Sequence, residues 1–145
     1  MSKNIYVTQA DYQSLRTLIN SGKYNTTLDG KYLGALEAEL LRATIVTETE
    51  IPSDVVTMNS VVCVENLGTG AQSTYQLVFP DKADFETGKI SILAPIGTAL
   101  IGERKGNVIK WQVPSGNVKL KIVKIEYQPE AAKDYNQTFN ISGRD

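Results

Sequence analysis

The spacing of apolar residues changes once along the chain, and this change sets the fold class. Before about residue 46, apolar residues recur every three or four positions, which is the period of an amphipathic helix. After about residue 59 they fall in short runs separated by glycine, proline and asparagine, which is the pattern of strands and turns. Pro52 lies between the two patterns and blocks a continuous helix across the boundary. The chain is therefore predicted to be α+β, with helices first and a sheet second.

Two helices are predicted within residues 1–46. Thr8 and Asp11 have the spacing of a capping box, with Asp in place of Glu, and Gly22 follows the last apolar turn of the first helix. Asp29 can cap a second helix, which we expect to run to residue 46. Their apolar faces consist of Tyr12, Leu15, Leu18 and Ile19, and of Leu33, Leu36, Leu40 and Ala43. The short turn between them predicts an antiparallel helical hairpin with a coiled-coil-like seam.

The second part of the chain is predicted to be one β-domain, residues 59–127, after a polar linker at residues 47–58. Strands are expected at 60–66, 73–79, 90–93, 108–113 and 118–127, with a short helix at 96–101. Residues 128–145 show no period and are predicted to form a tail with mobile ends. The fold class is thus a short N-terminal antiparallel helical hairpin plus a twisted antiparallel β-sheet with one short helix.

Composition excludes several kinds of chemistry. The 145 residues contain no histidine, which rules out a Ser-His-Asp or Cys-His nucleophile and any histidine metal ligand. The single cysteine, Cys63, allows no internal disulfide and no cysteine-rich zinc site, and it fits a reducing compartment. A net charge of -1 creates no overall field that would attract nucleic acid. No apolar run approaches the roughly 20 residues of a membrane helix, so we expect a cytoplasmic protein with no membrane partner.

A series of short motifs in the β-domain resembles the C-terminal domain of the Gre transcript-cleavage factors. In order, the motifs are Ser73-Thr74-Tyr75-Gln76-Leu77-Val78, Ala83-Asp84, Gly88-Lys89-Ile90-Ser91, Ala94-Pro95-Ile96, Leu100-Ile101-Gly102, Lys105-Gly106, Pro114-Ser115-Gly116 and Ile125-Glu126-Tyr127. Each is weak alone, but together they cover about residues 58–127 in the family's order. Residues 51–60 and 127–132 further resemble a member of this family whose helical hairpin is shortened. The resemblance implies an FKBP-like sheet and a regulator that is not an enzyme.

The resemblance also implies a partner, bacterial RNA polymerase. In Gre factors the barrel grips a coiled coil at the rim of the secondary channel, and acidic residues at the hairpin tip help bind a catalytic magnesium ion inside it. The grip centres on the loop after the third strand, here Leu93-Ala94-Pro95-Ile96-Gly97. This loop could be an exposed apolar docking patch stiffened by Pro95, or Ile96 could start the helix and pack on the sheet. Leu93 stands where family members often carry a polar or acidic residue, so a polar contact is lost or replaced.

The predicted hairpin turn lacks the groups that a magnesium site needs. The turn Gly22-Lys23-Tyr24-Asn25-Thr26-Thr27 contains no carboxylate, and magnesium prefers carboxylate and water oxygens. Asp29 is better explained as a helix cap than as a ligand. We therefore expect no metal and no cofactor, and no stimulation of transcript cleavage.

Lysines alternate along the last predicted strand. Lys119 and Lys121 share one strand face, and Lys110 can join them from the neighbouring strand. Such a row is the usual solvated face of an antiparallel sheet, with a phosphate-contacting strip as the alternative.

Three functions follow from this sequence. The first is a monomeric transcription regulator that binds RNA polymerase, competes with Gre factors and makes no specific nucleic-acid contact. The second is an FKBP-like peptidyl-prolyl isomerase, for which the large aromatic residues of the β-domain besides tyrosine are Phe79, Phe85 and Trp111. The third is a dimeric adaptor that pairs through the hairpin seam.

Overall fold

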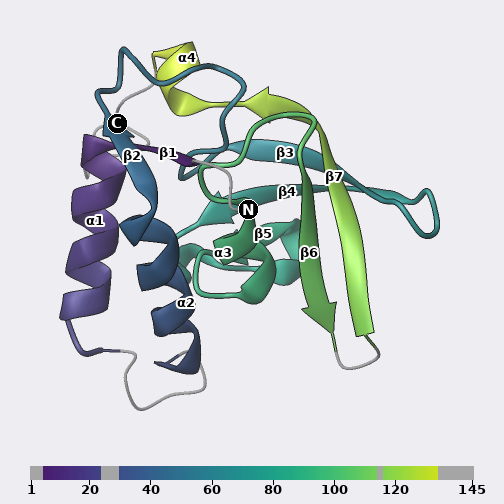
Figure 1. Cartoon of the computed structure of the whole chain (residues 1–145), viewed down its shortest axis with the longest axis horizontal. Helices are drawn as coiled ribbons and strands as arrows, with labels where there is room; N and C mark the ends of the chain where they lie inside the picture. The colour runs from purple at the N-terminus through teal and green to yellow at the C-terminus, as the bar shows by residue number, and fades with distance from the viewer. Residues whose placement is uncertain (1–4, 24–29, 114–115, 134–145) are drawn as a thin grey trace.

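A computed structural model describes residues 5–23, 30–113 and 116–133 of the chain (Figure 1). A helical part lies against one side of a five-stranded sheet, and a short helix fills the concave side of that sheet. In chain order the elements are β1 (Ile5–Thr8), α1 (Gln9–Asn20), α2 (Gly30–Leu41), β2 (Ala43–Val46), β3 (Val61–Asn66), β4 (Gln72–Val78), η1 (Pro80–Lys82), η2 (Phe85–Thr87), β5 (Lys89–Ser91), α3 (Pro95–Leu100), β6 (Val108–Val113), β7 (Gly116–Tyr127) and α4 (Pro129–Ala132). The mixed α+β class predicted from the sequence is confirmed.

The first helix begins where the capping pattern places it. The Thr8 hydroxyl accepts a hydrogen bond from the Asp11 backbone N–H at 3.0 Å, which satisfies one of the free donors at the start of α1. Leu15 is fully buried on the inner face of α1. The Arg16 guanidinium lies 3.4 Å from the Glu37 carboxylate of α2, so the two helices lie side by side (Figure 1).

The prediction that the second helix runs to residue 46 was wrong, because α2 ends at Leu41 and a strand follows it. In β2, Thr44, Ile45 and Val46 are β-branched residues, which favour strands over helices. The strand β2 pairs in parallel with β1, with Ile5 opposite Ala43. The seam residues remain inside, since Leu33, Leu36 and Leu40 are all buried in the core.

The strand β1 was not predicted, and it joins the helical part to the β-domain. Its Ile5 and Val7 are buried, and the Tyr6 N–H donates to the Gly102 carbonyl at 3.3 Å. Gly102 has a φ of +79°, and a Cβ at this position would lie 2.6 Å from the Cβ of Ile5. Glycine is therefore required where the barrel meets the first strand.

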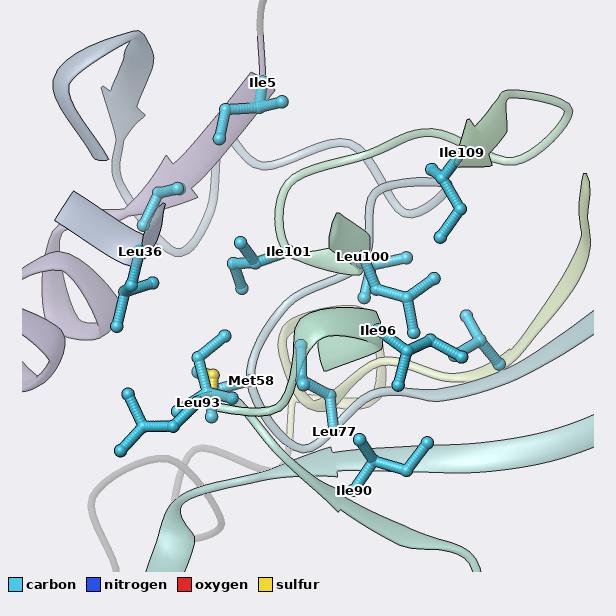
Figure 2. Packing of buried hydrophobic residues seen from close by; sticks show 14 of the residues in the cluster. Ile5, Leu36, Met58, Leu77, Ile90, Leu93, Ile96, Leu100, Ile101 and Ile109 are labelled. Atoms are coloured by element: carbon cyan, nitrogen blue, oxygen red, sulfur yellow. The ribbon is translucent and has the colours of Figure 1, made fainter. Parts of the chain in front are cut away.

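The main sheet has the strand order β5-β4-β3-β7-β6. Neighbours in this sheet are antiparallel except β4 and β5, which pair in parallel. The chain reaches β5 through η1 and η2, and then crosses the concave side as α3 to reach β6 at the other edge. The inner residues of the sheet and of α3 form one core, shown in Figure 2, with Ile96, Leu100, Leu77 and Ile90 packed together.

The predicted linker and part of the predicted tail belong to this packed structure. Val55, Val56 and Met58 are fully buried, although residues 47–58 form no helix or strand of their own. The Gln128 side-chain amide donates to the carbonyls of Pro52 and Val55, each at 2.8 Å. The start of the expected tail at residue 128 therefore differs from the structure, in which α4 packs against the linker. Residues 134–145 lie outside the described residues.

Membrane insertion finds no support in the helices that the structure describes. The longest of them has 12 residues, and none combines the length and the apolar character needed to cross a bilayer.

Candidate docking site

The loop after β5 presents a small part of its surface to solvent. Of the five residues predicted to bind a partner, Pro95 is exposed and Ala94 is half-buried. Leu93 and Ile96 are 0% and 3% exposed, and Gly97 is also buried. Ile96 thus packs on the sheet, as the alternative interpretation of the sequence proposed. A partner that approaches this loop would meet the ring of Pro95 and the backbone around it.

The local sequence fixes the shape of this loop. Pro95 is the first residue of α3, where its missing N–H costs no hydrogen bond. The Thr98 hydroxyl donates to the Ile92 carbonyl at 2.6 Å, and the Leu93 N–H donates to the Ser91 hydroxyl at 3.0 Å. A Cβ on Gly97 would collide with the Ser91 carbonyl oxygen, so glycine is needed there. The loop is therefore held rigidly by bonds at both ends.

Leu93 does not replace a surface polar contact with an apolar one. Its side chain points into the core beside Met58, as Figure 2 shows. Met58 belongs to the segment between the helical part and the sheet. Leu93 therefore links the base of the docking loop to that segment.

A buried carboxyl pair lies at the junction of the helical part, the linker and α4. The Asp11 carboxylate accepts a hydrogen bond from the Met58 backbone N–H at 3.0 Å, and Asp11 is 2% exposed. Glu130 is 4% exposed and accepts a hydrogen bond from the Thr57 hydroxyl at 2.8 Å. That hydroxyl is also 2.9 Å from the Ser60 hydroxyl, which must donate to it. The Oε2 atom of Glu130 is buried without a hydrogen-bond partner.

This burial changes the ionisation of both acids. The pKa of Asp11 is raised to about 7, first because the carboxyl is buried and second because Glu130 is close to it. Hydrogen bonds from Met58 and Thr8 oppose this shift. Burial likewise raises the pKa of Glu130 above its ordinary value, against the lowering effect of the Thr57 hydrogen bond. Two buried acids that raise each other's cost of ionisation in this way resist carrying a charge at the same time.

Sequence reasoning missed this pair. Asp11 was identified only as part of a capping motif, and residues 127–132 only as part of a family resemblance. The sequence offered one signal for the pair: an acid lies within the capping motif of the first helix, and another lies within residues 127–132. The contact between them spans most of the chain and has no local pattern.

The other residues considered in the sequence are placed as follows. Lys23 is exposed, and Tyr24 and Asp29 lie outside the described residues. Lys110 and Lys119 are directly opposite each other on β6 and β7, and both are exposed. Phe85 is 70% exposed and stacks on Tyr75 with ring centres 6.4 Å apart. The side chain of Trp111 lies outside the described residues.

Models of known families match both parts of the chain. The C-terminal model of the transcription elongation factors GreA/GreB matches residues 51–127, which include the docking loop. The chain belongs to the GreA/GreB family. The model of the Rnk N-terminus matches residues 3–46, which cover the helical part. The resemblance predicted from the motifs of the β-domain is confirmed.

Individual relatives agree with this assignment. The chain is 46% identical over 102 residues to the regulator of nucleoside diphosphate kinase from Escherichia coli K12, covering 70% of this chain and 75% of that one. It is 40% identical over 93 residues to the elongation factor GreA of Baumannia cicadellinicola, but it spans only 59% of that factor. Among solved structures, a GreA/GreB elongation factor from Nitrosomonas europaea superposes with a TM-score of 0.71 at 36% identity, covering 87% of this chain and 100% of that chain. The resemblance to one particular member of the family, predicted from residues 51–60 and 127–132, is thus also confirmed.

Proposed function

We propose that the protein binds RNA polymerase at the rim of the secondary channel, competes there with Gre factors, and does not stimulate transcript cleavage. The observation that carries this proposal is the GreA/GreB match over residues 51–127, because it includes the whole sheet and the loop at residues 93–97. We assign the contact to the exposed ring of Pro95 and to Ala94. Leu93 and Ile96 support them from the core.

The rigidity of the loop favours this role. Binding costs less when the binding segment is already ordered in the free protein. The bonds of Thr98 to Ile92 and of Leu93 to Ser91 hold the loop before any partner arrives. The exposed proline adds an apolar surface that has no side-chain freedom to lose.

Two features argue against cleavage activity. Each of α1 and α2 has 12 residues, which is about 18 Å at 1.5 Å per residue, a short reach for a catalytic centre deep in a channel. The turn at residues 22–27 carries one lysine and no carboxylate, so its sequence offers nothing to hold magnesium. A short hairpin can still block the rim, because occupancy alone excludes longer competitors.

The other two functions gain less support. A dimer through the hairpin seam would need exposed seam leucines, but Leu33, Leu36 and Leu40 are used inside this chain. A prolyl isomerase needs a pocket lined by aromatic side chains. Phe79 packs against the core, and Phe85 lies on the surface against Tyr75. These two rings therefore give no sign of a shared pocket.

The docking loop is tested by a double substitution that leaves the fully buried residues of the loop unchanged. Ala94→Arg with Pro95→Ser should weaken binding to purified RNA polymerase by at least about 2 kcal/mol, roughly 30-fold in Kd, as for an interface hot spot. Ile96 is left unchanged, because a charge at a 3% exposed position would unfold the protein.

The matched control makes the same changes at another short helix. Pro80 is the first residue of η1, and Ala83 is exposed just after it, so Pro80→Ser with Ala83→Arg removes a proline and adds a charge elsewhere. The control should bind normally. If the loop variant and the control variant have equal melting temperatures and bind polymerase with equal affinity, the loop is not the contact.

Cleavage is tested separately with backtracked complexes that carry labelled RNA. The protein should leave cleavage at the intrinsic rate of the polymerase and should inhibit a Gre factor added with it. Cleavage above the intrinsic rate, or no inhibition at saturating protein, would contradict the proposal.

A further inference from the structure

The main sheet has one covered face and one open face. Side chains of β3 and β7 alternate, so Val62, Val64, Leu120 and Ile122 are buried in the core with α3. On the opposite face, Cys63 and Glu65 are half-buried, and Lys119 and Lys121 are exposed. Figure 1 shows that the helices of the chain gather on the covered side and leave the strands β6 and β7 open.

Four lysines line the part of this open face that β6 and β7 form, and we call them the lysine face: Lys110, Lys119, Lys121 and Lys124. Lys110 on β6 stands directly opposite Lys119 on β7. Lys121 is opposite Glu65 of β3, and Lys124 is opposite Cys63. All four are exposed, and within residues 5–23, 30–113 and 116–133 none of them forms an ion pair.

The acids near the lysine face do not neutralise it. Glu65 accepts a hydrogen bond from the Gln72 side chain at 3.4 Å, and Glu126 is exposed further along β7. The face therefore carries a positive surplus in a chain whose net charge is -1. Like charges directly opposite each other on adjacent strands destabilise a sheet, so the pair of Lys110 and Lys119 has a cost in stability.

Protection of an edge explains only one of these lysines. Lysine on an edge strand prevents other chains from pairing with it, and β6 is an edge strand, so Lys110 has this explanation. The strand β7 lies between β3 and β6 and has no free edge. Edge protection therefore does not explain Lys119, Lys121 and Lys124 on β7.

We propose that the lysine face binds a single-stranded nucleic acid through its phosphate backbone. The charge of the face is complementary to phosphate, and lysine acts as a point charge that requires no fixed geometry of its ligand. From Lys119 to Lys124 the strand spans about 17 Å at 3.3 Å per residue, a line along which an extended single strand can lie. The phosphates of a duplex wind around its axis, so a duplex would bring fewer of them to the four lysines.

Binding on this face is independent of base sequence. Single-strand binding proteins add aromatic side chains on which bases stack, and the described residues offer no exposed aromatic ring beside the four lysines. Contacts to phosphate alone position a strand but do not read it. The face therefore gives weak, salt-sensitive and sequence-independent affinity.

This inference goes beyond the proposed function, because α3 and its docking loop lie on the covered side of the sheet. A partner held at Pro95 leaves the lysine face free for a second partner. Nucleic-acid binding is measured without polymerase, so its failure would not affect the docking proposal.

The test is fluorescence anisotropy of the full chain with a short labelled single-stranded RNA at several salt concentrations. Each lysine that contacts phosphate contributes about 0.7 to the slope of log K against log salt, so four give a slope of about -3. Lys119→Gln with Lys121→Gln should reduce the slope to about half and weaken binding at least several-fold at low salt. The matched control is Lys82→Gln with Lys105→Gln, which removes the same charge from two exposed lysines outside the open face.

Each outcome decides the proposal. The proposal is supported if the slope of log K against log salt falls in the Lys119 and Lys121 variant and stays unchanged in the control variant. An equal effect in the control would show only a general response to net charge and would overturn it. Tighter binding of a duplex would overturn the choice of a single strand. Failure of the wild-type protein to bind RNA would overturn the proposal. In that case, aggregation of the lysine variant would assign the lysines to solubility, and loss of its affinity for polymerase would assign them to a protein contact.

Discussion

Replacing Asp11 by Asn should remove most of the pH dependence of stability that arises at the junction of α1 and α4. Asn keeps an oxygen that can accept the hydrogen bond of the Met58 N–H, but it cannot ionise. The substitution therefore isolates the charge of residue 11 from its hydrogen bond.

The sign of the effect follows from the direction of the pKa. Asp11 is easier to protonate in the folded protein than in the unfolded chain, because its pKa rises from 3.8 to about 7. Its contribution to stability is therefore complete below about pH 4 and is lost as pH rises through about 7. At about 1.4 kcal/mol for each pH unit, the whole loss is about 4 kcal/mol, of which about 3 kcal/mol falls between pH 5 and pH 8.

The assay is urea unfolding of the wild type and of Asp11→Asn at a series of pH values. The two proteins should have similar stability below about pH 4, and the advantage of the variant should grow by about 3 kcal/mol between pH 5 and pH 8. The exposed Asp81→Asn serves as the control and should leave the pH dependence unchanged. Parallel stability curves for the wild type and Asp11→Asn would refute the reasoning, because they would show that residue 11 does not titrate in this range.

A second substitution tests the coupling between the two acids. Glu130→Gln keeps an acceptor for the Thr57 hydroxyl but removes the nearby charge, which is the second cause of the raised pKa of Asp11. Asp11 is still present in Glu130→Gln, so the loss of stability caused by its ionisation should occur at a lower pH than in the wild type. Titration of Asp11 at an unchanged pH would show that burial alone sets its pKa.

Three further substitutions test the packing. Gly102→Ala should cost more than about 2 kcal/mol, because the new Cβ meets Ile5 at a positive φ; a loss below about 0.5 kcal/mol in urea unfolding would contradict the close approach. Gln128→Ala should cost about 1–3 kcal/mol, because it leaves two carbonyls without their donor; an unchanged melting temperature would show that water replaces the amide. Leu36→Ala should cost about 2–5 kcal/mol and Leu41→Ala almost nothing, since Leu36 is 0% and Leu41 is 78% exposed; equal effects in unfolding would place α2 in a different rotation.

Local patterns in the sequence predicted the elements that depend on local interactions. The helix α1 begins at the Thr8 cap, and α3 begins at Pro95, because both starts are fixed by residues within one turn. The seam leucines of α2 are buried as their spacing indicated. The same spacing led us to include Ala43 in the helix, which was wrong. Ala43 pairs with Ile5, 38 positions earlier in the sequence, and this pairing overrides the helical period.

Long-range pairing explains what the sequence did not reveal. The strands β1 and β2 have four residues each and are separated by two helices, so their β-branched residues favour strands but only the fold shows that they pair. At the candidate site, the motif around Pro95 located the loop, but only the fold decides that Ile96 and Leu93 face inward. Asp11 and Glu130 come together across the chain, and no spacing between them could indicate this.

The bonds of Gln128 and Glu130 to the segment between the helices and the sheet also bear on how the chain folds. They connect residues 73 to 76 positions apart, so a long loop must close before any of them can form. A topology closed by such distant contacts folds more slowly than one built from neighbours. During synthesis, the carbonyls of Pro52 and Val55 must wait until residue 128 has left the ribosome. This side of the β-domain is therefore expected to close in a late, cooperative step of folding.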